Sequence, residues 1–231
     1  MFFLPVVFLI ILVYFCLLTA LFLLLKIGLI TFAFQKIGLQ GETIFLLLFF
    51  CLIGSWINLP IKKIYSEEIV PQRIIDFFGW KVKIPAARFR QSTILAVNLG
   101  GAIIPTTISL FLILKWWSLW PYFLVATTLV SFLVNLVAKP IKGLGIATPA
   151  LYPPAVAALI SFILITISPL TSESLPVIAY VCGTLGTLIG ADLLNLKKIG
   201  SLGAPVASIG GAGTFDGVFL TGIIAVLLTS F

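Results

Sequence analysis

The chain has 231 residues, of which 61% are apolar and only 9% are charged, and its formal net charge is +7. A soluble domain of this size keeps roughly a quarter of its residues charged, so this composition argues against one. It indicates an all-α polytopic membrane protein with a single transmembrane domain over residues 1–231. The absence of histidine excludes Ser-His and Cys-His hydrolases and zinc or haem sites that depend on histidine.

Long uncharged runs predict about seven transmembrane helices of about 20 residues each. In chain order these are residues 2–25, 42–59, 92–114, 121–138, 150–170, 175–194 and 208–230. The first run lacks the basic start and cleavage site of a signal peptide, so we expect it to be retained. The short apolar segment from Lys26 to Gly38 either extends the first helix or lies in the membrane interface.

The basic residues predict the orientation of the helices. The loops after the second, fourth and sixth runs contain eleven Lys and Arg residues, whereas the loops after the first, third and fifth contain three. Basic loops stay in the cytoplasm, which places the N-terminus inside and the C-terminus outside the inner or plasma membrane. Loop charge next to anionic lipid also accounts for the net charge. We therefore expect membrane lipid as a partner and no nucleic acid.

The cytoplasmic loop over residues 60–91 is too small to bury a core of its own. It mixes bulky apolar residues with Arg73, Lys81 and Lys83, which favours a segment lying on the membrane surface. A plain exposed loop is the alternative. The three cysteines all lie within apolar runs, so we expect no disulfide framework, no metal site and no cofactor.

Two acidic residues lie deep within the predicted helices, both toward the cytoplasmic side. Asp192 is five residues before Lys197, and Asp216 is eight residues past Ser208 on the returning run. At 1.5 Å per residue these positions are about 8 and 12 Å into the membrane. Acids inside a membrane usually face the bundle interior and are functional. The alternative is that each one hydrogen-bonds a helix end or an Asn on another helix.

Two irregular segments are predicted at the same depth. One is "AVNLGGAIIP", which contains Asn98, and the other is the proline-rich entry "ATPALYPP". Glycines surround Asp216, among them Gly211 and Gly213, and this segment is a candidate for unwound backbone that lines a ligand site. The stripe of Gly183, Gly186 and Gly190 favours close helix packing instead. The site-forming helices are therefore 92–114 and 150–230.

These motifs resemble the aspartyl intramembrane proteases, the superfamily of presenilin, signal peptide peptidase and prepilin peptidase. "GAD" ends at Asp192, "GAGTFDG" contains Asp216, and "PAL" is Pro149-Ala150-Leu151. Two residues interrupt the Gly-x-Gly-Asp motif, and the Pro-Ala-Leu segment comes before the acids instead of after them. The chain also looks like an uncharacterised prokaryotic multi-pass family of unknown function, which implies no activity.

The resemblance implies a catalytic pair of Asp192 and Asp216 that hydrolyses peptide bonds of membrane-spanning substrates. It implies substrate-binding roles for Pro149, Ala150, Leu151, Gly211, Gly213 and Asn98, with a transmembrane peptide as partner. A proton- or cation-coupled transporter that uses the same carboxylates is the alternative. A non-catalytic bundle in a larger complex is a third possibility, and the sequence does not determine the oligomeric state.

Overall fold

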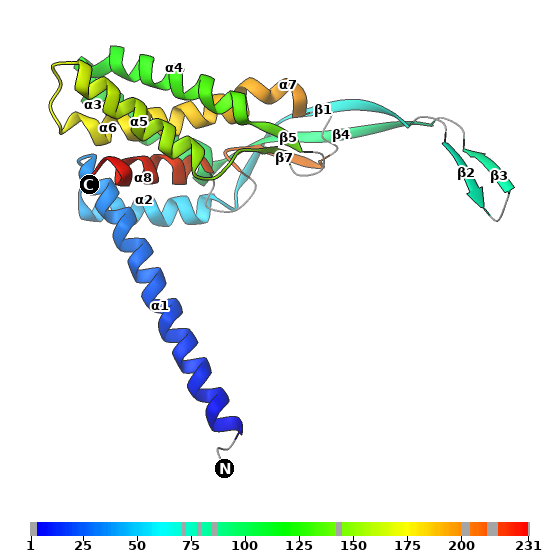
Figure 1. The fold of residues 1–231 in the computed structure, drawn as a ribbon, viewed down its shortest axis with the longest axis horizontal. Coiled ribbons are helices and arrows are strands. Elements are labelled where there is room, and N and C mark those ends of the chain that lie inside the picture. Colours follow the sequence, from blue (N-terminus) through cyan, green and yellow to red (C-terminus); the bar gives the residue numbers. More distant parts are fainter. Residues whose placement is uncertain are drawn as a thin grey trace.

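The computed structural model describes residues 4–70, 73–77, 80–84, 87–141, 145–199, 204–211 and 217–230. Helices form a bundle, and small sheets extend from one end of it (Figure 1). We call this the sheet end. The helical fold class is confirmed, but the sequence analysis did not predict the strands.

The helices include two π-helical segments, η1 and η3, and two short 3-10 segments, η2 and η4. In chain order they are α1 (Leu4–Lys36), α2 (Gly41–Gly54), η1 (Leu99–Ile103), α3 (Ile104–Lys115), η2 (Trp117–Leu119), α4 (Trp120–Val137), α5 (Tyr152–Ile167), α6 (Ser174–Thr187), η3 (Leu188–Asp192), η4 (Leu193–Asn195), α7 (Leu196–Ile199) and α8 (Gly217–Thr229).

Helix α6 is the centre of the bundle. Helices α4, α5 and α8 pack against it, and Leu185 is the one residue of α6 that is not buried. Figure 1 shows α1 leaving the bundle as a long single helix. It includes residues 26–36, so most of the Lys26–Gly38 segment extends the first helix, which was one of the two predictions. It ends at Lys36, and Gly38, two residues later, has a φ of 82°, the left-handed conformation that glycine adopts readily.

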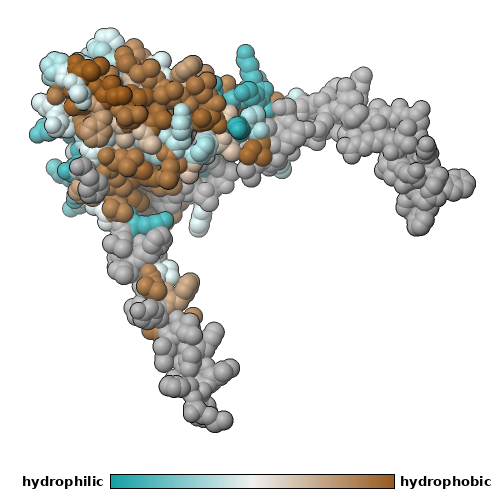
Figure 2. All heavy atoms as spheres, viewed as in Figure 1, coloured by the Kyte–Doolittle hydropathy of each residue, from teal (hydrophilic) through white to brown (hydrophobic). Residues whose placement is uncertain are grey.

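Two described helices are long and apolar enough to cross a membrane, namely Trp117–Val137 and Ser174–Ile199. Four shorter apolar helices accompany them. Large apolar side chains also cover outer faces of the bundle, among them Leu110, Leu114, Leu124, Phe132 and Leu159, each at least 52% exposed. Figure 2 shows this apolar surface over the helical part of the molecule.

The main sheet has the order β1-β4-β7. Strands β1 (Asn58–Val70) and β4 (Ala87–Asn98) are antiparallel, and β7 (Val206–Ile209) pairs with β4 in parallel. Two hairpins complete the strands, β2 (Arg73–Phe77) with β3 (Trp80–Ile84) and β5 (Lys139–Ile141) with β6 (Gly145–Ala147). The described residues of the 60–91 loop therefore form strands, so the prediction of a plain exposed loop was wrong, and the location on the membrane surface stays a prediction.

The third and seventh helices were predicted to begin earlier in the chain than they do in the structure. Residues 92–98 belong to β4, and the helical part starts with η1 at Leu99. In the last run β7 comes first, and α8 begins only at Gly217. Mean hydropathy does not separate an apolar strand from an apolar helix, and Thr, Ile and Val in β4 suit a pleated surface. Pro153 and Pro154 also lie inside the first turn of α5, where the missing N–H groups have no helical partner.

Candidate functional site

Asp192 lies at the last position of η3, where the helix that begins as α6 widens into a π-turn. The N–H of Leu193 donates to the carbonyl of Leu188, five residues earlier. A π-turn leaves nearby carbonyl groups without their usual helical donors. The Asn135 side chain of α4 donates to the Gly190 carbonyl at 2.9 Å, and the buried Asn195 donates to the Gly190 and Ala191 carbonyls at 3.2 and 3.0 Å.

The half-buried Asp192 carboxylate points toward the turn that follows β7. Its Oδ2 accepts a hydrogen bond from the Gly210 N–H at 2.8 Å. Gly210 has a φ of 79°, and a Cβ at this position would lie only 2.5 Å from the Cβ of Ala102 in η1. The turn therefore requires glycine both for its backbone conformation and for its close approach to η1. Gly210 was not among the predicted site residues, although its doublet with Gly211 is visible in the sequence.

Asp216 and Gly213 lie outside the described residues, so their positions stay predictions. Both neighbouring segments are described: Gly211, half-buried with a φ of 96°, and Gly217, the first residue of α8. Helix α8 packs closely on α6, because a Cβ on Gly222 would clash with the Thr184 hydroxyl. The predicted packing role of the α6 glycines is confirmed, since a Cβ on Gly186 would lie 2.6 Å from Val130 of α4.

Asn98 lies at the end of β4 and is fully buried. Its side-chain oxygen accepts from the Gly101 N–H at 2.7 Å and so caps η1. Its side-chain nitrogen donates to the Ser55 carbonyl at 2.6 Å and to Asn58 Oδ1 at 3.1 Å. Asn58 Oδ1 also accepts from the Ser208 hydroxyl. Asn98 therefore joins α2, β1, β4 and η1, and its predicted contact with substrate stays a prediction.

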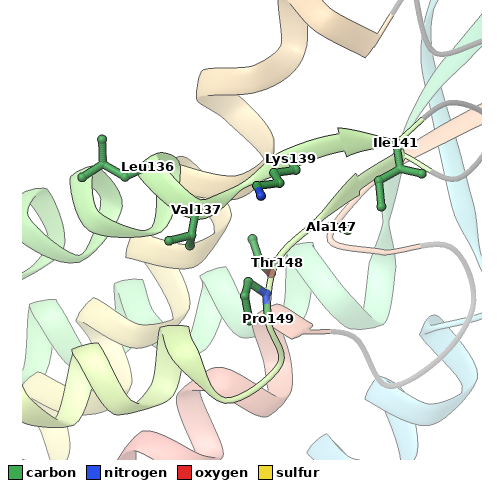
Figure 3. A pocket seen from close by; sticks show the side chains of 7 residues that line it. All are labelled: Leu136, Val137, Lys139, Ile141, Ala147, Thr148 and Pro149. Carbon is green, nitrogen blue, oxygen red and sulfur yellow. The ribbon is translucent and has the colours of Figure 1, made fainter.

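Pro149, Ala150 and Leu151 form the exposed connection between β6 and α5, and Leu151 is 71% exposed. Pro149 lines an open groove of about 590 Å³ together with Leu136, Val137, Lys139, Ile141, Ala147 and Thr148. Figure 3 shows that these residues come from the end of α4, the β5–β6 hairpin and the segment before α5. The groove is predominantly apolar, and Lys139 is the one charged residue among its described lining residues.

Residues near the four predicted segments meet in a small apolar cluster at the sheet end, although Pro149, Ala150 and Leu151 themselves are exposed and Asp216 lies outside the described residues. Its buried residues come from β4, η1, η3, α7, β7 and α8: Leu95, Ala102, Leu188, Ile199, Ala207, Ile209 and Val218. Ile146 of β6 packs against them. The strand before the Pro-Ala-Leu segment, the π-turn of Asp192 and the start of α8 therefore share one core. Packing brings these segments together, and Asp192 lies at the edge of that core.

The chemistry available among the described residues is that of a carboxylate, amide side chains and open backbone groups. The described part of the chain contains no cluster of three or more His, Cys, Asp and Glu residues that could hold a metal ion. A carboxylate can transfer protons, and glycine-rich backbone next to it can bind the backbone of an extended peptide.

Comparison with known proteins gives one match. A family model described as "Protein of unknown function (DUF1614)" matches residues 52–228. This range begins near the end of α2 and contains every described strand, the buried residues of the apolar cluster at the sheet end, and both acids. No curated protein and no solved structure matches the chain.

Proposed function

The chain belongs to the DUF1614 family of unknown function, and we propose that it is an intramembrane aspartyl peptidase-like enzyme. In this proposal Asp192 and Asp216 hydrolyse peptide bonds of membrane-spanning substrates. The supporting observation is the hydrogen bond from the Gly210 N–H to Asp192 Oδ2 at 2.8 Å. It joins the acid of η3 to the chain segment that carries the second acid six residues later.

The proposal includes a multi-pass location in the inner or plasma membrane. Two helices have the required length and hydropathy, and α1, at 33 residues, is about 50 Å long. The apolar outer faces of α3, α4 and α5 favour contact with lipid over contact with water. Seven spans, with the sheet end in the cytoplasm, agree with the distribution of Lys and Arg residues.

Chain connectivity supports a pairing of the two acids. Asp216 directly precedes Gly217, the first residue of α8, and α8 packs along α6. Val218 of α8 and Leu188 of η3 lie in the same apolar cluster. Each acid is therefore close in the sequence to a residue of that cluster, Asp192 to Leu188 and Asp216 to Val218.

The proposed reaction uses a shared proton. Two carboxylates a few ångströms apart in a low dielectric do not both ionise. The ionised carboxylate takes a proton from the attacking water, and the protonated one donates a hydrogen bond to the scissile carbonyl. Because the two groups titrate together, neither role belongs to one residue. The substrate, as an extended strand, pairs with backbone near Gly211 or near Pro149.

The test is cleavage of a fluorogenic transmembrane peptide by the full-length protein in liposomes. Asp192→Asn and Asp216→Asn should each lower kcat by at least about 100-fold, because each removes a proton-transfer group. Glu173→Gln, at an exposed acid before α6, serves as the control and should retain activity. Cleavage that persists in both Asp variants contradicts the proposal.

A cross-linking experiment tests whether the acids meet, independently of activity. In a variant whose native cysteines Cys16, Cys51 and Cys182 are replaced by Ala, Asp192→Cys and Asp216→Cys are combined and oxidised. A disulfide requires Cα atoms about 4.4–6.8 Å apart, so efficient intramolecular cross-linking supports the pair. Failure to cross-link under oxidation that links a neighbouring control pair contradicts it.

A proton- or cation-coupled transporter is the second candidate. The observation that favours it is the pair of described π-helical interruptions, η1 and η3, which both contribute to the apolar cluster at the sheet end. Discontinuous helices are common at the ion sites of transporters. This candidate predicts an Asp192-dependent proton or cation flux across liposomes in the absence of any peptide cleavage.

A further inference from the structure

Strand β1 lies at the edge of the main sheet, and no described strand pairs with its outer edge. The order of that sheet is β1-β4-β7, so β1 pairs with β4 on one side only. Figure 1 shows β1 and β4 extending away from the helical bundle as a long arm. At the start of this arm Ile61 and Tyr65 are 62% and 69% exposed. The backbone N–H and C=O groups along such an edge can pair with another strand.

The charges of β1 are arranged as a mirror about Tyr65. The strand reads "IKKIYSEEI" over residues 61–69. Two lysines lie three and two residues before the tyrosine, and two glutamates lie two and three residues after it. A strand with this pattern is complementary in charge to an antiparallel copy of itself.

The pairing within the chain leaves most of these charges without an opposite charge directly across the sheet. In the register of β1 with β4, both lysines and Glu68 lie opposite apolar residues, namely Leu95, Ile94 and Phe89. Glu67 lies opposite a charge of the other sign, at Arg90. An antiparallel neighbour at the outer edge of β1 would place an opposite charge beside each of the others.

One antiparallel register matches all of these charges. Along the outer edge of β1 the backbone groups of alternate residues point outward, so two copies pair only when even positions oppose even ones and odd oppose odd. The register centred on Tyr65 meets this condition. It places the lysines at positions 62 and 63 opposite the glutamates at positions 68 and 67 of the second copy, and the two-fold symmetry repeats both pairs.

Other arrangements of the same strand do not match the charges. Registers centred on Ile64 or on Ser66 put no lysine opposite a glutamate. A parallel copy in register puts like charges beside each other, which destabilises the pair. A bulge between Pro60 and Lys62, and the missing N–H of the proline, end the regular edge just before the first lysine. The charges therefore specify one register.

We propose that two copies of this chain associate through their β1 strands, in an antiparallel pair centred on Tyr65. The paired strands form one continuous sheet across the two copies, which is β-augmentation with a second copy as the added strand. The interface is isologous, because the same strand serves on both sides of a two-fold axis. This inference does not depend on the proposed function.

The length of the arm leaves room for this pairing. Tyr65 lies seven residues beyond Asn58, the first residue of β1, which corresponds to about 23 Å at 3.3 Å per residue. In the antiparallel pair the two bundles lie at opposite ends of the shared strands, and the two Asn58 positions are about 46 Å apart along them. The strands therefore form the contact without requiring the bundles to touch.

Disulfide cross-linking of the full-length protein in detergent micelles tests the register. In a background whose native cysteines are replaced by Ala, Tyr65→Cys places a cysteine directly opposite the same position of the second copy. Opposed Cα atoms of an antiparallel pair are about 4.5–5.5 Å apart, within the range of a disulfide. We expect this variant, after mild oxidation, to run mostly as a covalent dimer on non-reducing gels.

Ile61→Cys is the matched control, since Ile61 is about as exposed as Tyr65 on the same strand. In the proposed register the two copies of position 61 are eight residues apart, or about 26 Å, so covalent dimer should fall by at least about tenfold. A mixture of Ile64→Cys and Ser66→Cys, which oppose each other in this register, should cross-link with Tyr65 retained. Equal cross-linking at positions 61 and 65, or none in both Tyr65→Cys and the mixture, would overturn the proposal.

Charge reversal tests the complementarity, with the dimer dissociation constant in micelles measured by light scattering. Lys62→Glu turns two attractive pairs into repulsive ones, so we expect the dissociation constant to rise at least about fivefold. Adding Glu68→Lys restores the mirror pattern and should return the constant to within about twofold of the original. Both positions face apolar residues of β4, so the pairing within the chain is kept. An unchanged constant in the single variant, or no recovery in the double variant, contradicts the proposal.

Discussion

The two π-helical segments of the bundle have the same length but opposite surroundings. At η1 the backbone of Gly100 lies against α2, where a Cβ would meet the Cys51 carbonyl and the Ser55 nitrogen. The Asn98 side chain caps the start of the segment at Gly101 and also donates to Ser55 and Asn58. At η3 side chains of Asn135 and Asn195 satisfy the carbonyl of Gly190, and the segment ends on the half-buried carboxylate of Asp192.

In the proposed function, this difference separates a structural irregularity at η1 from a functional one at η3. The asparagine at η1 uses its amide within the protein and is fully buried, so it fixes how four elements meet. The acid at η3 faces a glycine turn whose neighbouring segment carries a second acid. A widened helical turn therefore does not identify a site. The partners of the polar residue beside it decide whether that residue is structural or available for chemistry.

Gly100→Ala should have the largest effect on stability and tests whether η1 is a packing element. The added methyl group meets backbone atoms of α2, which cannot move aside as a flexible side chain can. We expect the free energy of unfolding to fall by about 3 kcal/mol, at the upper end of overpacking effects, as measured by SDS titration or steric trapping. Gly190→Ala at η3 also meets backbone, that of Ser131, so a similar loss there is consistent with the packing of α6 on α4.

Gly28→Ala is the matched control for this prediction. Gly28 lies within α1 and has no neighbouring atom within 4 Å of a built Cβ. The same substitution should therefore be neutral, or stabilising by up to about 1 kcal/mol through helix propensity. A neutral Gly100→Ala would show that α2 and η1 do not touch.

Asn98→Ala should have an intermediate effect and tests the structural role of the amide. It leaves the Gly101 N–H and the Ser55 carbonyl unpaired in a buried environment. We expect a loss of about 2 kcal/mol in the free energy of unfolding. The activity per folded molecule of this variant should then stay within a few-fold of that of the unchanged protein. A stable variant that has lost activity would instead assign Asn98 to substrate binding, as the sequence predicted.

Asp192→Asn should have the smallest effect on stability. The amide oxygen can still accept from the Gly210 N–H, so we expect the free energy of unfolding to change by no more than about 1 kcal/mol. Together with the expected loss of activity, this result would show that Asp192 at η3 serves function, whereas Asn98 at η1 serves structure. A loss of stability comparable to that of Asn98→Ala would make Asp192 a structural residue too.

Much of the organisation was visible in the sequence. Apolar runs placed the helical segments, the α6 glycine stripe indicated close packing, and the irregular entry at Asn98–Gly101 was recognised. The strands were missed because an apolar strand and the end of an apolar helix have the same composition. Gly210 was missed as a partner of Asp192, since a backbone N–H has no signature in the sequence.

By itself the sequence determined which segments avoid water and where the acids are, because hydropathy and charge are properties of each residue. The tertiary structure alone decided which face of α6 each residue occupies and which groups satisfy one another. The π-turn at Leu188–Asp192 changes the angular position of every later residue on that helix, and the Asn135 and Asn195 side chains satisfy carbonyls within it. Contacts between residues far apart in the sequence determine these arrangements, so no local sequence pattern predicts them.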